Sequence, residues 1–169
     1  MPIPNFDENG FLPEGVYDAT ESELFEQFRI FRETTRRLDL SRLLKEYLGE
    51  IRERIPEAEV YVDGSFVTTK PIPSDIDLVL SLPETVIFNQ EDLSPYTANL
   101  ISASRVRRAY GFDILVAPRG SILQDDYLDD FQDVKGRPGL RKGIDYAAFT
   151  SANFLYEFAL DSLLTNTPQ

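Results

Sequence analysis

The sequence predicts a single α/β (α+β) domain in which a short mixed β-sheet is flanked by helices. The chain has 169 residues, which suits one domain with a hydrophobic core of its own. Short runs of β-branched and aromatic residues alternate with longer stretches whose apolar residues recur every three to four positions. The resulting order of helix, strand, strand, helix and strand is typical of one layered domain.

The N-terminal part of the chain divides at residue 20. Proline and glycine interrupt any periodicity in residues 1–19, which are therefore predicted to form an irregular N-terminal arm. Residues 20–169 are predicted to form the domain. Thr20 and Glu23 have the spacing of a capping box, which predicts that a short helix begins there.

Three further helices are predicted. Apolar residues at three-to-four spacing predict a helix over 35–54, which Pro56 ends. A second helix is predicted over 93–110, with a proline in its first turn. A final helix is predicted from Ser151 onward, with the apolar side chains Leu155, Phe158, Ala159 and Leu163 facing inward.

Strands are predicted over 59–63, 75–82, 112–117 and 144–149, where β-branched and aromatic residues lie between glycine or proline breaks. The stretch 119–143 is acidic and rich in glycine, and its periodicity predicts no element.

Composition restricts the chemistry that this chain can perform. It contains no cysteine and no histidine, which excludes disulfides, zinc–thiolate sites, thiol nucleophiles and Ser-His-Asp triads. Catalysis must therefore use carboxylates, hydroxyls, Lys, Arg or a metal ion held by oxygen ligands.

The net charge is −12, from 17 basic and 29 acidic residues. Because phosphate neutralisation supplies most nucleic-acid affinity, this balance argues against an extended nucleic-acid surface, though it leaves room for a small basic patch. Residues 1–17 lack the basic and apolar regions of a signal peptide, and no apolar stretch is long enough for a membrane span. We therefore expect a cytoplasmic protein.

Three aspartates predict a metal site. Residues i and i+2 of a strand share a face, so Asp75 and Asp77 are expected to lie side by side. Asp113 is a single acid inside a later apolar strand, and a buried carboxylate needs a partner or a metal. If the two strands are neighbours, these carboxylates form an all-oxygen site suited to Mg²⁺ or Mn²⁺.

Gly64 and Ser65 predict a phosphate-binding turn beside that site. A glycine at the end of a strand lets the backbone approach a ligand closely, and the amides that follow can donate to phosphate oxygens. Ser65 adds a hydroxyl, and Lys70 is the nearest cation that could serve the phosphates. A phosphate cradle beside metal-binding carboxylates is what nucleotidyl transfer requires.

These features resemble the nucleotidyltransferase fold superfamily (DNA polymerase beta-like). The residues that carry the resemblance are Gly64-Ser65, nine further residues, Asp75-Ile76-Asp77-Leu78 and the later Asp113. The longer segments 64–77 and 4–13 are also similar to a branch of small, poorly characterised prokaryotic nucleotidyltransferase-like proteins.

The resemblance implies that Asp75 and Asp77 hold two Mg²⁺ ions, that Asp113 holds the catalytic ion, and that Gly64 and Ser65 bind the phosphates of an NTP such as ATP. It implies transfer of a nucleoside monophosphate to an acceptor hydroxyl on a protein side chain, a tRNA end or a small molecule. The branch also resembles modules of toxin–antitoxin and defence systems, which act on a cognate partner.

One departure supports a different function. Many minimal members of the superfamily carry an arginine soon after the Gly-Ser turn, where this chain has residues 66–69 without a cation. The alternative is a catalytically silent nucleotide-binding or partner-binding module that keeps the fold. A glycosyltransferase Asp-x-Asp motif is a further alternative, but it leaves Gly64-Ser65 and Asp113 unexplained.

Other charged groups have simpler interpretations. Two arginine groups are interpreted mainly as solvated helix residues, and an aspartate run as an exposed acidic face. These groups are Arg36, Arg37 and Arg42; Arg105, Arg107 and Arg108; and Asp125, Asp126, Asp129, Asp130 and Asp133. The alternative for the second group is that one arginine reaches a phosphate or the acceptor.

Overall fold

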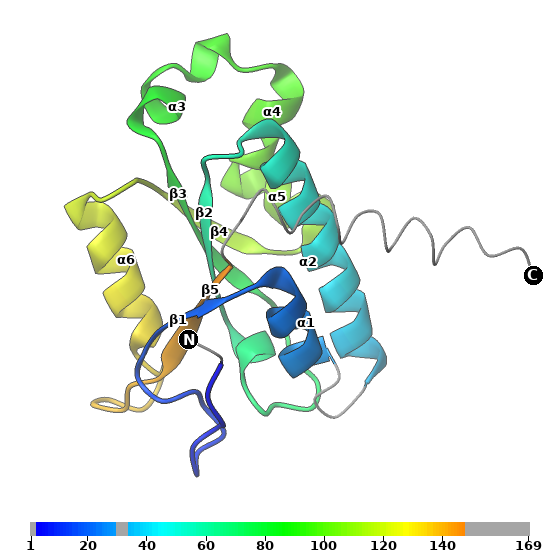
Figure 1. Ribbon diagram of the computed structural model, residues 1–169, viewed down its shortest axis with the longest axis vertical. Helices are drawn as coiled ribbons and strands as arrows, with labels where there is room; N and C mark the ends of the chain where they lie inside the picture. Colours follow the sequence, from blue (N-terminus) through cyan, green and yellow to red (C-terminus); the bar gives the residue numbers. More distant parts are fainter. Residues whose placement is uncertain (1–2, 30–33, 148–169) are drawn as a thin grey trace, which may run out of the picture.

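A five-stranded mixed sheet forms the centre of the computed structural model, which describes residues 3–29 and 34–147 (Figure 1). The strands are β1 (Gly15–Ala19), β2 (Glu59–Asp63), β3 (Asp77–Leu82), β4 (Asp113–Pro118) and β5 (Gly143–Ala147), in the order β1-β5-β2-β3-β4. The pairs β1–β5 and β3–β4 are parallel, whereas β2 is antiparallel to both of its neighbours. The predicted fold class is confirmed.

Helices cover both faces of the sheet. The helices are α1 (Glu21–Arg29), α2 (Thr35–Arg54), α3 (Glu84–Phe88), α4 (Pro95–Leu100), α5 (Ala103–Tyr110) and α6 (Ile122–Gln132), with short 3-10 turns at Ser65–Val67 and Gln90–Asp92. Figure 1 shows α1, α2 and α5 on one side of the sheet and α6 on the other. The main core lies under α1 and α2, and a smaller apolar cluster joins the sheet to α6.

The starts of the first two helices follow from local capping. The amide of Thr20 donates to the Glu23 carboxylate at 2.8 Å and the amide of Glu23 donates to the Thr20 hydroxyl at 3.2 Å, so the predicted capping box is confirmed. The Thr34 hydroxyl accepts from the Arg37 amide at 3.3 Å and caps α2. Helix α2 has the predicted bounds.

The N-terminal segment is more ordered than the sequence predicts. The expectation of an irregular arm over residues 1–19 is wrong for 15–19, which form β1 beside β5. Leu12 is fully buried, and its carbonyl accepts a hydrogen bond from the Gly143 amide at 2.7 Å. The cause is nonlocal, because the partner strand of this segment lies at the other end of the described chain.

Two other expectations need correction. The single helix over 93–110 is two helices, because the backbone is extended at Ser102 and this break lets both Leu100 and Ile101 be buried. The stretch 119–143 contains α6, whose start is capped by the Ser121 hydroxyl. The predicted helix from Ser151 onward, and residues 148–149 of the last predicted strand, lie outside the described residues. Among the helices of 3–29 and 34–147, none has the length and apolar character needed to cross a membrane.

Candidate metal and phosphate site

Three neighbouring strands carry aspartates at the same level of the sheet. Asp77 is the register partner of Asp63 on β2 and of Asp113 on β4. Directly opposed residues of neighbouring strands project to the same face. The three carboxylates therefore form a row on the face that α6 partly covers, since Tyr61 and Val79, two residues along their strands from this row, pack in the cluster against α6.

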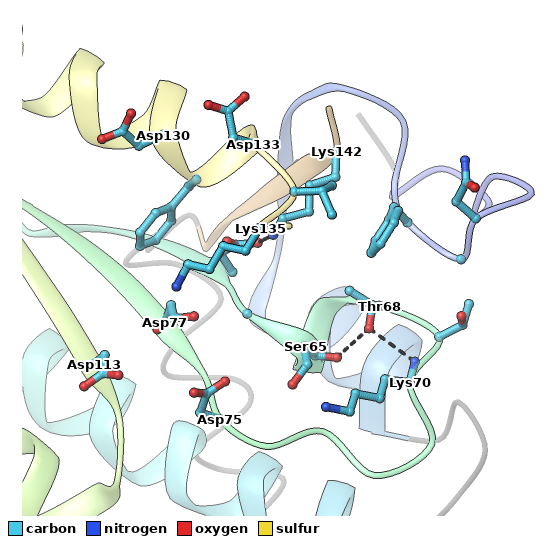
Figure 2. Close-up of a pocket in the computed structure, with 18 of the residues that line it drawn as sticks. Ser65, Thr68, Lys70, Asp75, Asp77, Asp113, Asp130, Asp133, Lys135 and Lys142 are labelled. Carbon is cyan, nitrogen blue, oxygen red and sulfur yellow. Dashed lines mark hydrogen bonds and ion pairs between the residues drawn. The ribbon is translucent and has the colours of Figure 1, made fainter. Parts of the chain in front are cut away.

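Asp75 joins this row from the loop before β3. The predicted strand over 75–82 begins two residues later than expected, at Asp77. Asp75, Asp77 and Asp113 nevertheless each place one carboxylate oxygen so that the three oxygens lie within 4.8 Å of one another, and all three residues are partly buried. Figure 2 shows these side chains directed toward one another. The structure thus brings together the three acids that the sequence singles out.

The electrostatic interactions among Asp75, Asp77 and Asp113 favour a bound cation. Burial raises the pKa of Asp77, and the nearby charges of Asp75 and Asp113 raise it further, while Lys135 and Lys142 oppose the rise. Ionised Asp77 is therefore disfavoured without a cation. A divalent ion among the carboxylates would remove this penalty.

Asp113 already has a cationic partner. Its carboxylate lies 2.9 Å from a guanidinium nitrogen of Arg107, in the last turn of α5, and both side chains are substantially exposed. One arginine of the basic group interpreted as a solvated helix end thus contacts a candidate metal ligand. Because such an exposed pair contributes only about 0–1 kcal/mol, a metal ion could displace the arginine.

Gly64 is required by its packing against the acids. Its φ of 89° lies in the left-handed region that glycine adopts readily. A Cβ atom at this position would lie 3.0 Å from the Asp77 amide nitrogen and 3.1 Å from an oxygen of its carboxylate, as well as 3.1 Å from the Asp75 carbonyl. Any side chain here would push the two aspartates out of place.

Ser65 and Lys70 lie at the edge of the cleft beside Asp75 (Figure 2). The Ser65 hydroxyl accepts from the Ser74 amide at 2.9 Å, and the Lys70 ammonium donates to the Ser74 hydroxyl at 3.3 Å. Thr68 donates to the Ser65 carbonyl at 2.7 Å and accepts from the Lys70 amide at 3.2 Å. These contacts hold the loop over residues 65–74 in a closed form. The Ser65 hydroxyl and the Lys70 ammonium group both lie at the cleft.

Arg37 holds the loop over residues 66–70 in place from the protein interior, a role that its sequence context did not predict. The side chain is fully buried, and its guanidinium donates to four backbone carbonyls at 2.6 to 2.9 Å. The acceptors are the carbonyls of Phe28, Phe66, Thr68 and Lys70. The interpretation of Arg37 as a solvated helix residue is therefore wrong. No local signal distinguishes it from its neighbours, because its acceptors come from distant segments.

The adjacent Arg36 holds the end of the same loop. Its side chain donates to the Pro73 carbonyl at 3.1 Å and also to the Ser74 carbonyl. Asp75 follows at once. Consecutive arginines in the first turn of α2 thus fix the loop on both sides of Lys70, from Phe66 to Ser74, directly before Asp75.

One cleft of about 800 Å³ is lined by the three acids Asp75, Asp77 and Asp113 together with Gly64, Ser65 and Lys70. Besides the acids and the loop just described, its walls include residues 9–11 of the N-terminal segment, Asp130 and Phe131 at the end of α6, and residues 133–135 that follow this helix. The Thr69 amide donates to the Gly10 carbonyl at 3.0 Å, which joins the N-terminal segment to the phosphate turn. Three lysines, Lys70, Lys135 and Lys142, also line the cleft.

A buried charged group extends from the wall of the cleft into the interior, with Asp63 and Lys142 in the wall and Asp145 outside it. Asp63 is ion-paired with Lys142, and burial raises the pKa of Asp63 to about 6 although the ammonium group opposes the rise. Asp145 is fully buried, and no residue in the described part of the chain donates a hydrogen bond to its carboxylate. Burial and the charge of Asp63 raise the pKa of Asp145 to about 8. The sequence signal for Asp63 was its position at the end of a strand, directly before Gly64.

The chain belongs to a family of unknown function, DUF6932, whose model matches residues 4–145. No curated protein and no solved structure matches the chain significantly. Family membership therefore assigns no activity, and function has to be inferred from the cleft.

Proposed function

We propose that this member of the DUF6932 family is a Mg²⁺-dependent nucleotidyltransferase. It would transfer a nucleoside monophosphate from an NTP to an acceptor hydroxyl and release pyrophosphate. The observation that supports this most strongly is the convergence of Asp75, Asp77 and Asp113 beside the Gly64–Ser65 turn. The nucleotidyltransferase superfamily is, in this proposal, the structural and chemical relative of the chain.

The donor set fits Mg²⁺ or Mn²⁺. Carboxylate oxygens are the ligands that these hard ions prefer, and the three oxygens are close enough to share a cation. Asp75 and Asp77 would hold both ions, and Asp113 the catalytic ion. When bound, the ions would supply charge neutralisation on the phosphates and activate the acceptor oxygen.

The residues of the phosphate turn would hold the triphosphate. Ser65 and Lys70 line the cleft beside the acids, and the Ser65 hydroxyl, the Lys70 ammonium and the amides that follow Gly64 would donate to the phosphate oxygens. The acceptor oxygen would form a bond to the α-phosphorus while the bond between this phosphorus and the α–β bridging oxygen breaks. The electron pair would leave with pyrophosphate, and Asp113 would take up the hydroxyl proton.

The charge of the chain favours a protein side chain or a small molecule as the acceptor. A net charge of −12 would repel a long polynucleotide, although a tRNA end could still approach one basic patch. We further propose action in the cytoplasm, where NTPs are available, on or with a cognate partner of a toxin–antitoxin or defence system.

One observation favours the alternative of a catalytically silent nucleotide-binding or partner-binding module. Asp113 is neutralised by Arg107, and an acid held in an ion pair is a poorer metal ligand and proton acceptor. In this alternative the cleft would bind a nucleotide or a partner without transfer.

The experiment that separates these functions incubates the protein with Mg²⁺ and each NTP, alone and with cell extract. Pyrophosphate release together with a nucleotidylated product supports the transferase. Nucleotide affinity without either product supports the silent module. Absence of nucleotide binding with Mg²⁺ and Mn²⁺ would exclude both nucleotide-dependent functions.

A further inference from the structure

We infer that Lys135 is a phosphate-binding residue, which contacts the polyphosphate of a metal-bound nucleotide from the wall opposite Ser65 and Lys70. This inference rests on the proposed function and deepens it. It assigns the cleft two lysines that act on the same polyphosphate chain from different sides. It also supplies a second cation besides Lys70, where residues 66–69 lack the arginine that many minimal members of the superfamily carry after the Gly-Ser turn.

The position of Lys135 carries the inference. Lys135 lies on the hairpin between α6 and β5, in the wall of the cleft. In Figure 2 its ammonium group extends over Asp77 toward the three acids, whereas Lys70 approaches beside Asp75. A phosphate held by ions on these acids would meet both lysines.

Lys135 differs from Lys142 and Arg107, the ion-paired cations near the acids, because its ammonium group has no carboxylate partner among the described residues. Lys142 is ion-paired with Asp63, and Arg107 is ion-paired with Asp113. Within the described residues, Lys135 makes no ion pair or hydrogen bond, and its side chain is exposed. A lysine that faces a cleft with its three donors free is suited to phosphate oxygens.

The hairpin that presents Lys135 is anchored at its base. The Val134 amide donates to the Leu140 carbonyl at 3.1 Å, and Asp133 pairs with Arg141 in an isolated β-bridge. The Arg141 guanidinium also bonds the carboxylates of Glu14, Asp129 and Asp133 at 2.7 to 2.9 Å. The lysine is thus carried by a loop whose base is fixed to α6 and the N-terminal segment.

The test compares Lys135→Met with the matched control Arg137→Met. Arg137 lies on the same hairpin and is exposed, but it does not line the cleft, so its removal changes the net charge equally. Calorimetry would measure the affinity for Mg²⁺·ATP, for inorganic pyrophosphate with Mg²⁺, and for Mn²⁺ alone. A Lys135→Arg variant tests rescue of the positive charge.

We expect Lys135→Met to weaken ATP and pyrophosphate binding by about tenfold or more, because a charge-assisted hydrogen bond is lost. Binding of Mn²⁺ alone should be unchanged or tighter, since a cation beside Asp77 has gone. Arg137→Met should stay within about twofold of wild type for both phosphate ligands, and Lys135→Arg should restore most of the affinity.

Unchanged ATP and pyrophosphate affinity in Lys135→Met would overturn the inference. Equal losses in Arg137→Met, or a parallel loss of Mn²⁺ affinity in Lys135→Met, would overturn it too, because the effect would then be general charge or damage to the fold. If the wild type binds pyrophosphate through Lys135 but transfers nothing, the proposed activity fails and the inference stands. If the wild type binds neither phosphate ligand with Mg²⁺, both fail.

Discussion

Asp77 and Asp113 are register partners in the parallel ladder between β3 and β4, so their carboxylates leave the sheet on the same face. Asp75 reaches them from a loop instead of a strand, and that loop is held by Arg36 and Arg37. The site therefore has two supports, a sheet ladder for two acids and a pair of arginines, buried Arg37 and exposed Arg36, for the loop that carries the third.

Mn²⁺ or Mg²⁺ at millimolar concentration should raise the melting temperature, because an ion that binds only the folded state stabilises it by mass action. At about one hundred times the dissociation constant, we expect a shift of roughly 5 °C or more. Asp77→Asn should melt higher than wild type without metal, since its charge is disfavoured, and should lose most of the metal-dependent shift.

The control for this measurement is Asp126→Asn on α6. Asp126 is exposed and does not line the cleft, so the variant should keep the full metal-dependent shift. A wild-type melting curve that Mg²⁺ and Mn²⁺ leave unmoved, with and without NTP, would contradict the metal site.

Gly64→Ala should weaken metal and nucleotide binding even where the protein folds. The added Cβ would meet Asp77 and the Asp75 carbonyl at 3.0 to 3.1 Å and displace the acids. Gly120→Ala is the matched control, because Gly120 also has a positive φ but an open space around the Cβ position. Both variants should lose about 1–2 kcal/mol of unfolding free energy from backbone strain. Circular dichroism and metal titration would show that only Gly64→Ala loses the ion.

Arg37→Met should destabilise the fold by about 3–5 kcal/mol, because four backbone carbonyls lose a charged donor in a buried place. Arg37→Lys should recover only part of this, since a single ammonium cannot replace the planar fork. Arg42→Met, on the same helix, removes an exposed pair with Glu46 and should change the unfolding free energy by less than about 0.5 kcal/mol. Urea denaturation measures all three; a similar small effect for Arg37→Met would refute the buried anchor.

Asp145 should make the fold less stable as pH rises. Its pKa is about 8 in the folded protein, against 3.8 for an ordinary aspartate side chain. Between these values the folded state keeps a proton that the unfolded state releases, so the unfolding free energy falls with pH across roughly 4 to 8. Each full pH unit inside this window costs up to about 1.4 kcal/mol.

Asp145→Asn removes this titration. Its unfolding free energy should exceed that of wild type near pH 8 and depend less on pH between about 5 and 8, whereas Asp126→Asn should follow wild type. Urea denaturation at a series of pH values makes the comparison. Parallel curves for Asp145→Asn and wild type would show that Asp145 is not the group responsible.

The capping box at Thr20 and the glycine at the end of β2 could be predicted because each signal depends on a few consecutive residues. The residues that form such short-range contacts are close in the sequence, so their spacing alone indicates the contact. The proximity of Asp75 and Asp77 was also predicted, but Asp75 reaches Asp77 from a loop and not through the i and i+2 alternation of a strand.

What the sequence did not predict depends on distant partners. Strand β1 exists because β5 lies beside it, and Arg37 is buried because carbonyls from α1 and the phosphate turn converge on it. Helix α6 was hidden by its acidic composition, although Tyr127 and Phe131 do face the sheet. The pattern of apolar residues within one segment does not indicate which distant segment will pack against it.

The most direct test of the central claim follows the two ends of the triphosphate. The protein is incubated with Mg²⁺ and cell extract in parallel reactions with α-labelled and γ-labelled NTP, and Asp113→Asn is the control. We expect that only the α-label becomes attached to an acceptor while the γ-label appears in pyrophosphate, and that Asp113→Asn slows this transfer by at least about a hundredfold. Transfer of the γ-label, or equal α-label transfer by Asp113→Asn, would contradict it.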